Sequence, residues 1–288
     1  MPWNDHAGKF SALKAVVFLF TLYPAVWLVG RWAVGDLGAR PFTEAIHRTG
    51  DWSVRFLVFA LAVTTARAIF EFSRILLVRR MLGVAAGLYA VLHFVLYIFD
   101  QKWNLWTVAS EVVLRFYLTV GFVALVGLSA LCWTSTDWWQ KRLGPVWKKL
   151  HRWAYPLTVL AMFHYALQAK INAKTAVFWF GLFIWLMLWR ALPRRHHMRL
   201  GWLLAITPVA TLVTAATEVT WYGLATTVSA QRVFEANLVF DPWARPASEV
   251  LVLGLVVVGL ATLRQMQRHR HGRIKFLQRN EKSRRRRH

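Results

Sequence analysis

Long apolar runs alternate with short polar segments along the whole chain. Eight runs are long enough to cross a bilayer as helices, and they cover residues 14–32, 52–70, 81–99, 112–133, 152–169, 175–192, 200–222 and 248–264. A spanning helix needs about 20 mostly apolar residues, and a soluble domain does not carry such runs repeatedly. The pattern therefore predicts an all-α, polytopic transmembrane helix bundle. The first run follows a polar start and lacks a small-residue cleavage site, so we expect a retained span rather than a signal peptide.

Charge is distributed unevenly between the segments that join these runs. The formal net charge is +23, and most of the 36 Lys and Arg residues fall on the side that holds both chain ends, including the basic tail from Arg264 to His288. Segments that stay in the cytoplasm carry such an excess of positive charge. We therefore expect cytoplasmic N- and C-termini and a tail that contacts anionic lipids, and we do not expect nucleic-acid binding.

The segments between the runs are too short for a soluble catalytic domain. No glycine-rich phosphate-binding loop follows a strand-like pattern, so no nicotinamide or flavin nucleotide domain is expected. The single cysteine, Cys132, allows no intrachain disulfide and is expected to pack as a small residue. Tryptophans at the ends of the runs are expected to anchor at the membrane surfaces, with Trp103 and Trp106 outside and Trp133, Trp138, Trp139 and Trp147 inside.

Three histidines lie within or next to apolar runs: His93, His151 and His164. An ionisable side chain at membrane depth is costly and usually functional, and neutral imidazole is a common axial ligand of haem iron. The runs that hold His93 and His164 both proceed from the inner to the outer side, which places both residues in the outer half of the membrane. The pattern predicts that these two histidines ligate one haem from opposite sides.

A second haem toward the inner surface would involve His151, which precedes His164 by thirteen residues, or roughly 20 Å along a helix. A haem at each of these two histidines would therefore lie in a different leaflet of the bilayer. Thirteen residues also leave the two histidines on different helix faces. Either Pro156 changes the helical phase, or His151 lies in the link before the helix.

The partner of His151 is not evident from spacing. Arg79 and Arg80 lie at the matching depth on the helix that carries His93. Arginine cannot ligate iron, but it can pair with haem propionates. A second ligand would come from His196 or His197, or would be absent. The sequence therefore predicts the outer haem site more completely than the inner one.

Three segments of the chain resemble a known family. They read RRMLGVAAGLYAVLHFVLYIFDQ, RFYLTVGFVALVGLSALCWTS and LGPVWKKLHRWAYPLTVLAMFHYALQAK. They resemble the MsrQ (YedZ) family, the haem-binding membrane subunit of the periplasmic methionine sulfoxide reductase system, which belongs to the ferric-reductase-like transmembrane group. The resemblance covers roughly residues 14–192.

The resemblance implies a six-helix core that holds one or two b-type haems through His93, His151 and His164. It implies electron transfer from the quinone pool to a periplasmic molybdopterin protein, MsrP, which reduces methionine sulfoxide in proteins. FMN is a further cofactor of the family, but no FMN or quinone site is assigned here residue by residue. The implied location is the bacterial inner membrane, and the implied role is a non-catalytic electron-transfer subunit of an oxidoreductase.

The family usually ends near the sixth run, whereas this chain continues. We therefore expect a haem-binding core over residues 1–199, a two-helix transmembrane appendage over 200–264 and a basic cytoplasmic tail over 265–288. Two other functions remain open. One is a stand-alone membrane reductase of ferric iron or another small acceptor. The other is a non-redox transporter or structural protein whose histidines relay protons or pack helices.

Simpler roles are expected for the remaining small and polar residues. Gly83 and Gly87 are expected to allow close helix packing. Arg115 and Glu218 are expected at the outer membrane surface, and a quinone- or partner-contact role stays open for Glu218. The other histidines in links and tails are expected to be solvated, namely His6, His47, His269, His271 and His288.

Overall fold

The computed structural model describes residues 3–4 and 8–285, and the surroundings of side chains up to Arg268. The described residues form helices and no β-strand, and seven of the helices are long and apolar enough to cross a membrane. They are α1 (Ala12–Ala33), α2 (Pro41–Phe70), α3 (Leu76–Asp100), α5 (Phe116–Trp133), α9 (Lys174–Ala191), α10 (Leu200–Ala225) and the first part of α12 (Pro246–Arg285). The prediction of an all-α, polytopic membrane bundle is confirmed.

The other helices are shorter. The predicted run 152–169 forms α8 (Ala154–Ala169), which has 16 residues. At about 1.5 Å per residue, α8 is roughly 24 Å long, less than the hydrocarbon core of about 30 Å. It is therefore not one of the seven long spans. The remaining helices are α4 (Leu105–Leu114), α6 (Asp137–Leu143), α7 (Pro145–Leu150) and α11 (Ala230–Asn237), with the 3₁₀ turns η1 (Ser73–Ile75), η2 (His151–Trp153), η3 (Lys170–Asn172) and η4 (Arg194–His196).

Helix α2 begins eleven residues before the predicted run at 52–70. Pro41 occupies its first turn, where the missing N–H costs nothing and the fixed φ favours the helix. Glu44 lies in the same turn, where a negative charge stabilises the helix N-terminus. The polar stretch before residue 52 is therefore helical, and the expectation that His47 lies in a link is wrong.

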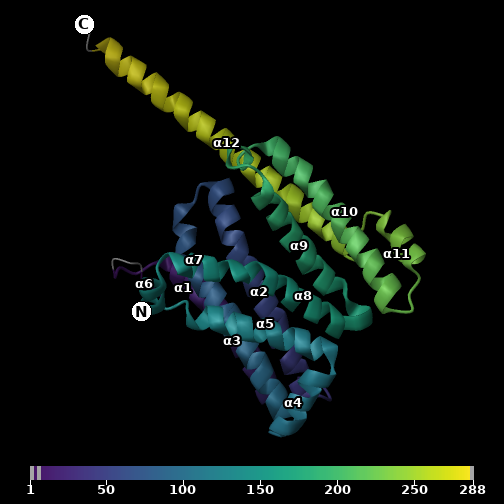
Figure 1. Ribbon diagram of the computed structural model, residues 1–288. Helices are drawn as coiled ribbons and strands as arrows, with labels where there is room; N and C mark the ends of the chain where they lie inside the picture. Colours follow the sequence, from purple (N-terminus) through teal and green to yellow (C-terminus); the bar gives the residue numbers. More distant parts are fainter. Residues whose placement is uncertain (1–2, 5–7, 286–288) are drawn as a thin grey trace.

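Four helices, α2, α3, α5 and α8, pack around a common interior (Figure 1). Small residues allow the close approach of α3 and α5, because a Cβ at Gly87 would lie only 2.7 Å from the Cβ of Cys132. Cys132 is thus a packing residue, as predicted. A Cβ at Gly83 would meet no described atom within 4 Å, so only Gly87 makes the close contact expected of the pair.

A tyrosine fastens α1 to this bundle. Pro24 lies inside α1 and interrupts its backbone hydrogen bonding. The hydroxyl of Tyr89 enters the opening: it accepts a hydrogen bond from the Ala25 N–H at 3.0 Å and donates one to the Thr21 carbonyl at 2.9 Å. Tyr89 lies one turn before His93 on α3, so this contact also fixes the part of α3 that carries that histidine.

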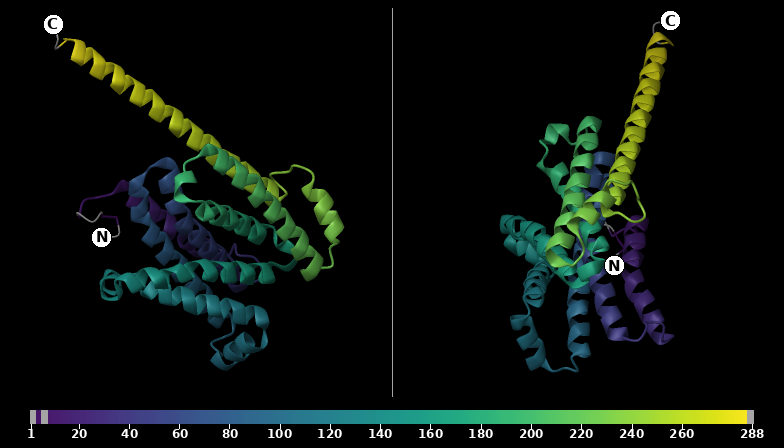
Figure 2. Two further views of the ribbon diagram at one scale, coloured as in Figure 1. Left: turned by 45° about the horizontal axis from the view of Figure 1, so that its top comes forward. Right: turned by 90° about the vertical axis from the view of Figure 1, so that its right-hand side faces the viewer.

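The two C-terminal spans form a layer beside α9. In Figures 1 and 2, α10 and α12 run side by side along α9, and α12 then extends beyond the other helices. Glycines permit this packing, because Cβ atoms at Gly181 and Gly254 would lie 2.3 Å from Thr214 and 2.4 Å from Thr207. Apolar residues of α10 and α12 share a buried cluster with α2, α8 and α9.

One acid in this layer is buried by its protein neighbours. Glu218 is 3% exposed and lies near the C-terminal end of α10, and its place at the outer membrane surface stays a prediction. Its carboxylate accepts a hydrogen bond from the Asn237 amide at 2.9 Å and lies 3.3 Å from the Arg245 guanidinium. A buried charge needs such partners to offset its desolvation. Glu218 therefore holds α11 and the start of α12 against α10.

Candidate functional site

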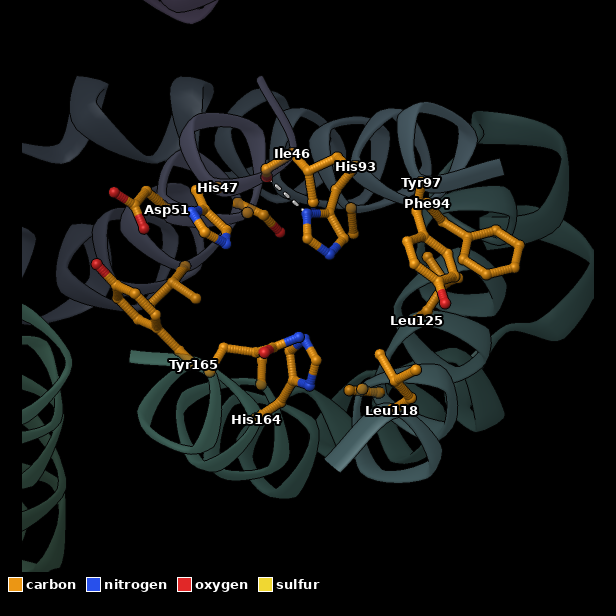
Figure 3. Close-up of a pocket in the computed structure, with 18 of the residues that line it drawn as sticks. Ile46, His47, Asp51, His93, Phe94, Tyr97, Leu118, Leu125, His164 and Tyr165 are labelled. Carbon is orange, nitrogen blue, oxygen red and sulfur yellow. Dashed lines mark hydrogen bonds between the residues drawn. The ribbon is translucent and has the colours of Figure 1, made fainter. Parts of the chain in front are cut away.

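A cavity of about 410 Å³ lies inside the four-helix bundle. This volume falls within the range of about 300–1,000 Å³ typical of cofactor and ligand pockets. Residues of α2, α3, α4, α5, α8 and η3 line it, and none of the lining residues comes from α9 to α12. Figure 3 shows His93 and His164 projecting into it from opposite walls.

The orientation of His93 is set by helix α2. The Nδ1–H of His93 donates a hydrogen bond to the Ile46 carbonyl at 2.7 Å. The ring also lies against Gly50, where a Cβ would come within 3.0 Å of Nδ1. The backbone hydrogen bond selects the tautomer whose Nε2 carries a lone pair, and Nε2 is the atom directed toward the cavity. His93 is thus prepared to ligate a metal through Nε2.

Helix α5 holds His164 in the same way. The Nδ1–H of His164 donates to the Tyr117 carbonyl at 2.8 Å, and a Cβ at Gly121 would lie 2.6 Å from the ring. In both cases the carbonyl acceptor precedes the glycine by four residues on the neighbouring helix. The same local arrangement therefore occurs twice, and each copy leaves one Nε2 unused by the described residues.

The spacing of the two rings fits axial ligation of one iron. The ring centroids of His93 and His164 lie 6.2 Å apart, and the ring planes are nearly perpendicular at 84°. Two imidazoles on opposite sides of one metal ion, with metal–nitrogen distances of about 2 Å, place their centroids roughly 6 Å apart. The predicted matched depth of the two residues agrees with this contact.

The remaining ligands of such an iron would have to come from the cofactor. Among the described residues, no group of three or more His, Cys, Asp or Glu side chains is placed to hold a metal ion. Two imidazoles alone make a weak metal site, whereas a haem macrocycle supplies four equatorial nitrogens and needs only the two axial ligands. The pair of histidines therefore fits haem better than a free ion.

A polar network joins the outer ends of α3, α4 and α5 next to the cavity. The Tyr97 hydroxyl donates to the Glu111 carboxylate at 2.7 Å, and Arg115 pairs with the same carboxylate at 2.7 Å. Arg115 also donates to the Tyr117 hydroxyl at 3.1 Å. Because Tyr117 supplies the carbonyl that orients His164, this exposed network helps to fix the start of α5. Arg115 lies at the helix end, as predicted.

His151 does not lie in this cavity. It occupies η2, just before α8, so the alternative that placed it in the link is the one observed. Its Nδ1 is 3.1 Å from the Trp147 carbonyl, its Nε2 is 3.3 Å from Ser135 Oγ, and its ring stacks on Trp147 at 3.9 Å. Burial lowers the pKa of His151, which favours the neutral imidazole that ligates metals. Trp147 is thus a partner of His151 rather than only a membrane anchor.

The other predicted inner-site residues are dispersed. Arg80 pairs with Asp137, whereas Arg79 lies near His151 and forms no ion pair with a described residue. His196 and His197 contact Trp202 and Trp189, and no hydrogen bond or ring contact joins either of them to His151. The structure brings His93 and His164 together and leaves His151 without a second imidazole among the described residues.

Sequence reasoning misses the polar residues that line the cavity beside the two ligand histidines, and His47 is the clearest of them. His47 lies on α2 and projects toward the cavity (Figure 3). The signal that identifies it is Pro41, which marks the start of a helix and brings the following polar residues into the bundle. The side chains of His6, His269, His271 and His288 lie outside the part of the chain whose surroundings are described.

Comparison with known protein families identifies the central part of the chain. Residues 49–162 match the family model described as "Ferric reductase like transmembrane component". This range includes His93 and His151 and stops two residues before His164. No solved structure matches the chain.

Curated relatives match a larger part of the sequence. A Rhodospirillum rubrum protein is 36% identical over 200 residues, which is 69% of this chain and 94% of the relative. A Caulobacter vibrioides protein is 35% identical over 193 residues, covering 65% of this chain and 90% of the relative. A Xanthomonas oryzae protein is 36% identical and covers 63% and 82%, respectively. Each is named "Protein-methionine-sulfoxide reductase heme-binding subunit MsrQ". This chain belongs to the MsrQ family.

Proposed function

We propose that this chain is a haem b-binding electron-transfer subunit that passes electrons from the quinone pool to a periplasmic molybdopterin protein, MsrP, which reduces methionine sulfoxide in proteins. The observation that carries the proposal is the opposed pair His93 and His164, each with Nδ1 bound to a backbone carbonyl and Nε2 toward one cavity. The name shared by the relatives supports the same role.

The residues of the site have separable tasks in this proposal. Bound haem would supply the one-electron redox chemistry. His93 and His164 hold its iron, and their backbone acceptors keep each ring in the ligating tautomer. Apolar side chains such as Leu125 and Phe94 exclude water from the cavity. The chain itself transforms no substrate, so it acts as an electron carrier for a partner enzyme.

In this proposal electrons cross the membrane, and the outer haem site lies next to the periplasm. We assign cytoplasmic termini and a bacterial inner-membrane location, supported by the positive charge of the inner segments. A second, inner haem or its entry site involves His151, with Arg79 or Arg80 near the propionates. Arg79, which forms no ion pair with a described residue, suits such a role, while Arg80 would exchange Asp137 for a propionate. FMN remains a cofactor proposed from family membership alone.

The proposed boundaries follow from the lining of the cavity. The haem-binding core comprises residues 1–199, the two-helix appendage residues 200–264 and the basic tail residues 265–288. The cavity is lined by residues 46–172 only, which supports a core that does not need the appendage for cofactor contact.

A quantified haem spectrum of the purified full chain tests the proposal. The reduced-minus-oxidised spectrum should be that of a b-type haem. Alanine at either His93 or His164 should remove the outer haem while the protein still inserts into the membrane, because one imidazole then lacks its opposite ligand. His196→Ala is the control, since His196 packs against Trp202 and does not line the cavity. A colourless full-length protein, or full haem content in both variants, contradicts the proposal.

A further inference from the structure

The cavity between His93 and His164 has a polar side and an apolar side. Figure 3 shows His47, Asp51 and Tyr165 at one side and Phe94, Leu118 and Leu125 at the other, where the hydroxyl of Tyr97 is already paired with Glu111. The polar side is the gap between α2 and α8, and it also contains Gln168 and Asn172. A flat ligand held between the two imidazoles therefore meets polar groups along one edge and apolar groups along the opposite edge.

Asp51 and Tyr165 lie next to each other, and Asp51 also has a cationic partner. The Arg55 guanidinium lies 3.8 Å from the Asp51 carboxylate. The side chains of His47, Gln168 and Asn172, by contrast, form no hydrogen bond with another described residue. His47 and Asn172 are exposed and Gln168 is half-buried, so these side chains lie where the cavity opens and can donate to a ligand that brings acceptors.

These three side chains lie at the outer end of the cavity. His47 is one turn before Asp51 on α2, Gln168 is one turn beyond His164 on α8, and Asn172 lies in η3 just after α8 ends. The inner end offers no free donor among the described lining residues, because Ser53 donates its hydroxyl proton to the Ala86 carbonyl at 2.9 Å. The other residues there are small or apolar, such as Ala124 and Leu128.

We infer that His47, Gln168 and Asn172 bind the haem propionates and thereby fix the orientation of the haem in the cavity. The inference rests on the proposed function. A haem held by His93 and His164 would carry both carboxylates on one edge, and that edge would be stabilised where the cavity supplies hydrogen-bond donors. Only the outer end supplies N–H donors from described residues. Hydrogen bonds from such donors to a carboxylate are stronger than bonds between neutral groups.

The test compares two cofactors that differ only in their carboxylates. Full-length protein made without haem is titrated in detergent with protohaem and with its dimethyl ester, in which both carboxylates are masked. His47→Ala should weaken protohaem binding roughly tenfold, as expected for a lost hydrogen bond to a charged group. The same substitution should leave binding of the dimethyl ester unchanged. His47→Gln, which keeps an N–H donor, should recover part of the difference.

Arg48→Gln is the matched control. Arg48 follows His47 on α2, but it pairs with Glu44 at 2.6 Å, lies over the Trp27 ring and does not line the cavity. The Arg48→Gln variant should bind protohaem and its dimethyl ester as tightly as the unchanged protein does. Gln168→Leu and Asn172→Leu should each show a smaller loss that is also selective for protohaem.

Three results bear on different claims. A selective loss of protohaem binding in the His47→Ala variant supports the inference. Equal weakening of both cofactors, or no weakening of either, overturns it while leaving haem ligation by His93 and His164 intact. Failure of the unchanged chain to bind either cofactor overturns the proposed function and this inference with it.

Discussion

The outer and inner histidine sites use the same side chain in different ways. At the outer site, His93 and His164 each bind one backbone carbonyl through Nδ1 and present Nε2 to a shared cavity. At the inner site, His151 contacts the Trp147 carbonyl and Ser135 with its two nitrogens and stacks on Trp147. The outer site is prepared for an opposed pair of ligands, whereas the inner site holds a single imidazole between protein partners.

This difference shows what determines a ligand site beyond the presence of histidine. Membrane depth alone suggests a similar role for all three residues, because each imidazole is costly to bury. The outer residues gain their geometry from neighbouring helices, through Ile46 with Gly50 and Tyr117 with Gly121. His151 is held instead by a turn of its own segment, where Gly144 has a φ of +48° and Pro145 starts α7.

The largest effect is expected from filling the space that a glycine leaves for an imidazole. In a Gly121→Ala variant the new Cβ would lie 2.6 Å from the His164 ring, so the ring must move, and overpacking of this kind costs about 1–3 kcal/mol. We expect haem content to fall several-fold. Gly50→Ala should have a smaller effect, because its closest approach is 3.0 Å. Haem per purified chain is the measurement.

Gly83→Ala is the control for this series, since no described atom lies within 4 Å of the Cβ it would add. It should retain haem fully and stabilise α3 by up to about 1 kcal/mol, the helix preference of alanine over glycine. Equal haem content in the variants at Gly121 and Gly83 would show that the His164 ring does not need the space beside Gly121.

An intermediate loss of haem is expected from a change at the inner site. His151→Ala should remove only the inner haem and leave the spectrum of the outer haem unchanged, because His151 does not line the outer cavity. Haem per chain and the number of redox transitions measure this. Ser135→Ala should have a smaller effect on the inner haem, because the Ser135 hydroxyl lies 3.3 Å from His151 Nε2. One haem per chain before and after the change would rule out the inner site.

The smallest effect on haem is expected from removing the C-terminal helices. A chain that ends after Arg199 should insert in the same orientation and remain red, because no described residue of α10 to α12 lines the cavity. Its Tm should fall, since buried residues such as Leu203 and Val250 belong to a cluster shared with α2 and α9. Normal insertion without haem would mean that the appendage belongs to the cofactor site.

The sequence predicts the outer ligand pair because two simple rules agree there. Alternating spans give the direction of each helix, and residue counts along parallel helices give matched depth, so His93 and His164 are expected to face each other. The seven long spans follow from apolar length alone. Only the run at 152–169 differs, because the helix that it forms, α8, ends at Ala169 after 16 residues.

Other parts of the site depend on contacts between distant segments. The role of Gly50 and Gly121 follows from which ring packs on each, and spacing along one helix does not give that contact. His47 escapes prediction because its segment is as polar as a link, although Pro41 and Glu44 mark a helix start. The buried position of Glu218 depends on Arg245 and Asn237, which come from the following loop and helix.

The spin state of the ferric haem in the purified full-length protein tests the central claim most directly. Two imidazole ligands on one iron predict a low-spin outer haem in the unchanged protein. His93→Gly and His164→Gly should each lose that low-spin signal, with little haem retained at the outer site. Added imidazole, which fits the space left by the missing ring, should restore it. A low-spin signal that persists in either variant without added imidazole would contradict ligation of one haem by His93 and His164.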